Sequence, residues 1–85
     1  MKLIIRTKTL DEFRAVSNYA YKNGITSITN QKLSDKFWND SKENTFILID
    51  DDTMYYGKIK SSMQYINPED FLKLKFDNDK TKSRK

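Results

Sequence analysis

The chain has 85 residues, of which 36% are hydrophobic and 13% aromatic, and it contains no cysteine and no histidine. A chain of this length builds one core rather than two, and it buries only about 60% of the surface that its unfolded form exposes. Without cysteine or histidine it lacks disulfides, thiol nucleophiles, a histidine base and the commonest transition-metal ligands. Its longest apolar runs, 3–5 and 46–49, are far shorter than the roughly 20 residues that span a bilayer. We therefore expect a small, soluble, cytoplasmic protein.

The net charge of +4 comes from one end of the chain. Residues 1–79 hold twelve Lys or Arg and twelve Asp or Glu, so their formal charges cancel. The whole excess lies in the last six residues, at Lys80, Lys82, Arg84 and Lys85. We expect a single domain over 1–76 and a basic, flexible tail over 77–85. Such a tail either contacts nucleic-acid phosphates, with release of counterions, or is a solvated terminus without a partner.

The N-terminal part of the chain predicts a strand followed by a helix. Residues 2–6 carry the run Leu-Ile-Ile, whose continuous apolarity favours a central place in a sheet. Thr9 and Glu12 have the T-x-x-E spacing of a capping box, in which two side chains satisfy backbone amides at a helix start. Apolar residues then recur at three- and four-residue steps, which is typical of a helix with one apolar face. Gly24 can adopt the left-handed backbone conformation that ends a helix. We expect a helix from Leu10 to Asn23.

The middle of the chain predicts another strand, a polar segment and a hairpin. β-Branched residues over 25–29 indicate a strand without an obvious partner. In the polar segment 30–44 we expect a short helical turn anchored by Trp38. The run Phe-Ile-Leu-Ile within 45–50 leaves no polar face, which is typical of a buried strand. Three aspartates then turn the chain into a returning strand over 53–60, in which Gly57 suggests a bulge.

The C-terminal part predicts a short extended segment over 63–66 and a short helix. Asn67 and Pro68, followed by two acidic residues, have the chemistry of a helix start. Together the elements indicate an α+β domain with two layers: a mainly antiparallel sheet of three or four strands, one long helix packed on it and a short C-terminal helix. One helix and a stub do not cover both faces of a sheet, so we expect the second face to be open to a partner.

The only cluster of carboxylates is Asp50, Asp51 and Asp52. Oxygen ligands suit Mg²⁺, but neighbouring strand residues point in opposite directions, and the turn lacks the glycine-bearing spacing of a calcium loop. We expect a solvated turn here and no metal or cofactor. The sequence has no Gly-rich phosphate loop, nucleophile elbow or zinc spacing, so we predict that the protein is not an enzyme.

Aromatic and basic residues alternate along the strand expected at 53–60. Tyr56, Lys58 and Lys60 share one face of it, whereas Tyr55 belongs to the other. Exposed strands of this composition stack bases and hold phosphates, while the alternative is an edge strand blunted by its lysines. The candidate nucleic-acid-binding residues are Arg6, Lys8, Tyr56, Lys58, Lys60, Lys80, Lys82, Arg84 and Lys85.

Three aromatic residues are candidates for contact with a protein: Trp38, Tyr19 and Tyr55. Tryptophan and tyrosine are frequent anchors of protein interfaces, because they combine a large apolar area with a polar tip. For Trp38 the alternative is a loop residue folded onto a small core.

Several stretches of the chain resemble a known class of proteins. They read F-R-A-V-S-N-Y-A-Y-K-N-G at 13–24, then, after Trp38, E-N-T-F-I-L-I-D-D-D at 43–52, M-Y-Y-G-K-I at 54–59 and Y-I-N-P-E-D-F-L at 65–72. This order resembles small accessory proteins of tailed bacteriophages, in which a similar helix precedes a hairpin and a similar ending. The resemblance implies a host-takeover or counter-defence factor that binds and blocks a bacterial target. A narrower similarity is to a phage RNA-binding inhibitor of a toxin–antitoxin ribonuclease.

We therefore predict a non-catalytic phage inhibitor in the cytoplasm of the infected host. Its expected partner is RNA, a host nucleic-acid-handling defence protein such as a toxin ribonuclease, or both, and no membrane is involved. The alternative is a protein-only inhibitor that acts through an exposed sheet edge or an aromatic patch.

Overall fold

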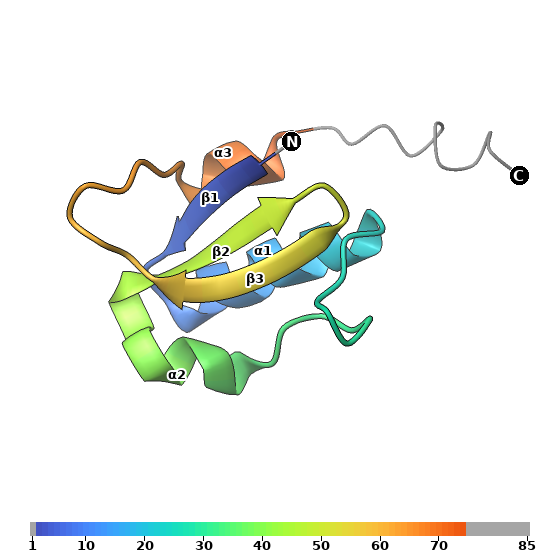
Figure 1. Cartoon of the computed structure of the whole chain (residues 1–85), viewed down its shortest axis with the longest axis horizontal. Coiled ribbons are helices and arrows are strands. Elements are labelled where there is room, and N and C mark those ends of the chain that lie inside the picture. The colour runs from blue at the N-terminus through green and yellow to red at the C-terminus, as the bar shows by residue number, and fades with distance from the viewer. Residues whose placement is uncertain (1, 75–85) are drawn as a thin grey trace, which may run out of the picture.

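The computed structural model describes residues 2–74, and its centre is a three-stranded antiparallel sheet (Figure 1). The strands are β1 (Lys2–Thr7), β2 (Thr45–Asp50) and β3 (Thr53–Lys58), in the spatial order β1-β2-β3. The three strands lie close to their predicted positions. The central place predicted for β1 is wrong, since β2 is the strand that pairs with both others along its whole length.

The outer edge of β1 is covered in part by Ile66. The Ile66 N–H donates to the Ile4 carbonyl at 2.9 Å, and the Arg6 N–H donates to the Ile66 carbonyl at 3.1 Å. This parallel bridge at Ile5 and Ile66 is the only part of the extended segment predicted at 63–66 that pairs with the sheet. Because Ile66 covers part of this edge, β1 can carry an unbroken apolar run although it is an edge strand.

The helix α1 (Leu10–Lys22) covers one face of the sheet. Its first turn has the predicted cap at Thr9, whose hydroxyl accepts from the Glu12 N–H at 3.1 Å. The Glu12 carboxylate also reaches back, but it accepts from the Lys8 N–H at 2.7 Å, one residue before the cap. The helix ends at Asn23, and Gly24 follows with a φ of +87°, a conformation that favours glycine. The predicted boundaries are therefore correct to within one residue. The prediction of a long helix is not confirmed, since thirteen residues is an ordinary length.

A second helix, α3 (Pro68–Leu72), lies on the same side of the sheet as α1 (Figure 1). It begins after Asn67 with Pro68 in its first turn, as predicted. Phe71 is fully buried and meets the ring of Tyr19 edge-on, with centroids 5.7 Å apart. The protein is thus an α+β fold with α1 and α3 on one face of the sheet.

The strand predicted at 25–29, between α1 and β2, is reduced to one bridge residue and a turn. Only Thr26 pairs with β3, and the chain then turns, with the Ser27 N–H donating to the Gln31 carbonyl at 2.7 Å. The predicted helical turn at Trp38 is confirmed: a 3₁₀ turn over Asp35–Phe37 leads into α2 (Trp38–Ser41), and a second 3₁₀ turn over Lys42–Asn44 precedes β2.

The core lies between the sheet and the helices α1 and α3. Its largest members are Phe13 from α1, Phe71 from α3, Ile5 from β1, and Ile47 and Ile49 from β2. No bulge is found at Gly57, because the register of β2 and β3 is continuous. Among the described helices, none is both long and apolar enough to cross a membrane.

Candidate protein-binding groove at the sheet edge

The two faces of the sheet carry different side chains. Strand alternation places Met54, Tyr56 and Lys58 on the face that α1 covers, where Met54 is buried. Tyr55 and Gly57 belong to the opposite face, which none of the helices described within residues 2–74 covers (Figure 1). The predicted alternation is correct. However, Tyr56 and Lys58, the candidate nucleic-acid-binding residues of this strand, do not belong to the open face.

The open face is mainly apolar. One cross-strand row consists of Ile4, Leu48 and Tyr55, and the next row consists of Arg6, Phe46 and Gly57. Most of these residues are half-buried because they cover one another, while Tyr55 is exposed.

The guanidinium of Arg6 is held by three groups from distant parts of the chain. Its nitrogens donate to the Glu43 carbonyl at 3.2 Å, to Asn44 Oδ1 at 3.3 Å and to the Tyr65 hydroxyl at 2.9 Å. It also lies over the Tyr65 ring, with its central carbon 5.4 Å from the centroid. These contacts tie the segments on both sides of β1 together, so they favour a structural role for Arg6 over phosphate binding.

Trp38 and Tyr19, two of the three candidate interface aromatics, make hydrogen bonds within the fold. The indole N–H of Trp38 donates to the Thr7 carbonyl at 3.1 Å, and the Trp38 carbonyl accepts from the Thr45 hydroxyl at 3.3 Å. The Tyr19 hydroxyl donates to the Leu74 carbonyl, next to α3. Both side chains are half-buried against the core.

The candidate basic residues within the described part of the chain do not gather on one surface. Lys8 lines a hollow together with Glu12 and Glu69, whose carboxylates oppose phosphate binding there. Lys58 and Lys60 are exposed at the end of β3. The remaining candidates, Lys80, Lys82, Arg84 and Lys85, lie outside the described residues.

The strongest candidate for a binding site is an apolar groove of about 250 Å³ at the outer edge of β3. Its lining includes Ile28 from the turn after Thr26, Leu33 and Phe37 from the following segment, and Tyr55 and Tyr56 from β3. Ile28 is 76% exposed, the highest value of any large hydrophobic residue described, and Tyr55 and Tyr56 are 41% and 40% exposed. Such a group of exposed apolar side chains marks an interaction surface.

Of these groove residues, only Tyr55 and Tyr56 are predicted from the sequence to belong to a candidate site, whereas Ile28 and Phe37 are not. The ring of Phe37 stacks on that of Tyr56 at 4.4 Å and 8°, which fixes one wall of the groove. Ile28 was interpreted as part of a strand. Its place between Ser27 and Thr29, both polar, was the one available signal of an exposed turn.

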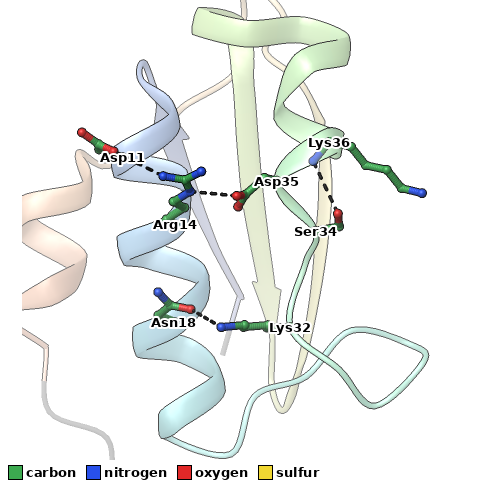
Figure 2. A network of polar contacts seen from close by, with 7 residues as sticks. All are labelled: Asp11, Arg14, Asn18, Lys32, Ser34, Asp35 and Lys36. Carbon is green, nitrogen blue, oxygen red and sulfur yellow. Dashed lines mark hydrogen bonds and ion pairs between the residues drawn. The ribbon is translucent and has the colours of Figure 1, made fainter.

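A larger hollow of about 550 Å³ lies between α1 and the segment 31–35, but its charged groups already have partners. Arg14 Nε is 2.8 Å from Asp35 Oδ2, and Lys32 Nζ is 3.0 Å from Asn18 Oδ1 (Figure 2). These contacts fasten the segment to the helix. We therefore interpret this hollow as part of the packing between α1 and the segment 31–35, and not as a binding site.

The described residues contain no cluster of acidic side chains suited to a metal ion. Asp51 and Asp52 form the tight turn between β2 and β3, where Asp51 has a φ of +57°. The chain matches no family model, no curated protein and no solved structure.

Proposed function

We propose that this protein is a non-catalytic inhibitor that binds a protein target through the groove at the outer edge of β3. The observation that carries the proposal is the exposed group of Ile28, Tyr55 and Tyr56 around an apolar groove. The resemblance to phage accessory proteins suggests the class of target, a bacterial defence or nucleic-acid-handling protein in the host cytoplasm.

Contact with protein is favoured over contact with RNA for two reasons. Residues 2–74 hold eleven Lys or Arg and ten Asp or Glu, so the described domain offers no general excess of positive charge to a phosphate backbone. In addition, Arg6 donates three hydrogen bonds within the fold. RNA binding would thus depend on Lys58, Lys60 and the basic tail.

The test is affinity capture from bacterial lysate after nuclease digestion. Wild-type protein is compared with Ile28→Ser, which alters a side chain too exposed to support the core, and with Tyr21→Ser as a matched control. Tyr21 is 45% exposed but lies on α1, outside the groove. We expect one partner to be retained by the wild type and the control and lost by Ile28→Ser. A partner retained equally by all three proteins would exclude the groove.

A second measurement separates the RNA hypothesis from the protein hypothesis. Binding of labelled RNA is measured at two salt concentrations, for the full chain and for the chain without residues 80–85. If RNA binds in a salt-dependent way that requires the tail but not Ile28, the protein-only proposal fails and the RNA-binding one replaces it.

A further inference from the structure

The outer edge of β3 is paired over only part of its length. The Thr26 N–H donates to the Asp52 carbonyl at 3.0 Å, and the Met54 N–H donates to the Thr26 carbonyl at 2.8 Å. These two bonds show that Asp52 and Met54 direct their backbone groups away from β2. By strand alternation, Tyr56 and Lys58 do the same.

The pairing ends after Thr26 because the chain turns at Ser27. If the chain continued parallel to β3, residue 28 would lie between Met54 and Tyr56 and pair with their outward backbone groups. Ile28 lies in the turn instead. Within residues 2–74, no backbone hydrogen bond joins Tyr56 or Lys58 to a residue outside the hairpin. The free stretch of the edge therefore runs from the Met54 carbonyl to Lys58, beside the apolar groove.

Positive charge lies at one end of the free stretch and beside the groove, whereas Asp51 and Asp52 precede the other end of β3. Lys58 and Lys60 lie at the end of the free stretch, and Lys36 precedes Phe37 in the groove wall. None of these three lysines forms an ion pair within residues 2–74. Asp35, the acidic neighbour of Lys36, is held by Arg14, while the Lys36 side chain extends away from α1 (Figure 2).

We propose that the free edge of β3 accepts an extended segment of a partner protein as an added strand, with apolar side chains toward the groove and carboxylates toward Lys36, Lys58 and Lys60. This inference rests on the proposed function and specifies its ligand. Backbone hydrogen bonds to an exposed edge supply affinity in such complexes, and alternate side chains supply specificity. Attraction between the carboxylates of the ligand and these lysines speeds the association and fixes the register of the added strand.

A second copy of this chain suits the free edge less well. Antiparallel pairing of two copies over the free stretch is centred on Tyr56, so Lys58 of each copy faces Met54 of the other. The next residues of each copy, Ile59 and Lys60, then run into the part of the edge where Thr26 is already hydrogen-bonded. An RNA chain has no peptide groups that could pair with those of Tyr56 and Lys58.

The proposal is tested by amide hydrogen exchange at Tyr56 and Lys58, measured by NMR on the full chain. Three capped peptides are added at millimolar concentration. The first has a Val-Thr-Val-Thr-Val centre with two aspartates at each end, the second has lysines in place of the aspartates, and the third keeps the aspartates around a proline centre. We expect only the first to slow exchange at both amides, by about tenfold or more, because only it combines a pairing backbone with opposite charge.

The proposal is overturned if the aspartate peptide does not slow amide exchange at Tyr56 and Lys58, or if the lysine peptide slows it equally. Slowing that appears without peptide and grows with protein concentration identifies a second copy as the occupant. Slowing by a uridine oligonucleotide in place of the peptide identifies a nucleic acid.

A variant separates this inference from the proposed function. Lys58→Pro removes the outward N–H at an edge position where proline is tolerated, and Lys58→Gln is the control that keeps the N–H but not the charge. We expect Lys58→Pro to abolish protection of Tyr56 by the aspartate peptide and Lys58→Gln to weaken it severalfold. If both variants bind the peptide like the wild type, strand addition is excluded. Loss of the captured partner in Ile28→Ser would then still support the groove as its site.

Discussion

The ring of Phe46 on β2 lies against Gly57 on β3, directly across the strand pair. A Cβ atom at Gly57 would be 2.5 Å from Cζ of that ring, too close for real atoms. Glycine at this point of a strand is therefore explained by the close approach of Phe46 and not by a bulge.

This contact predicts that Gly57→Ala destabilises the protein. Alanine in place of glycine would by itself favour the strand by up to about 1 kcal/mol, but displacing the Phe46 ring costs roughly 1–3 kcal/mol. We expect a net loss of about 1 kcal/mol in the free energy of unfolding, measured by urea denaturation. The same change in a Phe46→Leu background should be neutral or stabilising, and equal effects in both backgrounds would contradict the contact.

Arg6→Lys should destabilise the protein although the charge is kept. Lysine cannot donate at once to the Glu43 carbonyl, Asn44 and the Tyr65 hydroxyl, because its ammonium group lacks the planar fork of arginine. We expect a loss of about 1–2 kcal/mol in urea denaturation, with faster amide exchange near Asn44. Lys8→Ala is the control and should change stability by less than about 0.5 kcal/mol. A neutral Arg6→Lys would reopen a role for Arg6 in ligand binding.

Trp38→Phe tests whether the tryptophan is structural. Phenylalanine keeps an aromatic ring but leaves the carbonyl of buried Thr7 without the indole donor. We expect a loss of roughly 1–3 kcal/mol in stability, followed by circular dichroism during urea denaturation. Tyr21→Phe, at an exposed position on α1, should stay within about 0.5 kcal/mol of the wild type. If Trp38→Phe retains full stability but loses the captured partner, Trp38 is an interface anchor instead.

Gly24→Ala should destabilise the end of α1. Within residues 2–74, no atom lies within 4 Å of the position that an alanine Cβ would take here, so the cost comes from the backbone, at a φ of +87°. We expect a loss of about 1 kcal/mol in thermal or urea unfolding, and a smaller loss for Gly24→Asn, because asparagine tolerates the left-handed region better. Equal losses for both variants would point to a packing cause.

Local patterns predicted the ends of several elements. The capping box at Thr9 and Glu12, the glycine after Asn23 and the proline at the start of α3 each act through neighbours a few residues away. The alternation along β3 was likewise correct, since it depends only on strand geometry. The strand predicted at 25–29 failed because the turn at Ser27 competes with pairing to β3 after a single residue.

The sequence by itself determined the fold class, the helix α1, the hairpin and the absence of cysteine and histidine chemistry. Only the tertiary structure decided which face of the sheet is covered, that Arg6 and Trp38 hold the fold together, and that Ile28 meets Phe37 and the tyrosines of β3 around a groove. The reason is distance along the chain. Helix caps and strand alternation follow from near neighbours, whereas Arg6 meets Tyr65 and Trp38 meets Thr7 only after the core has brought remote segments together.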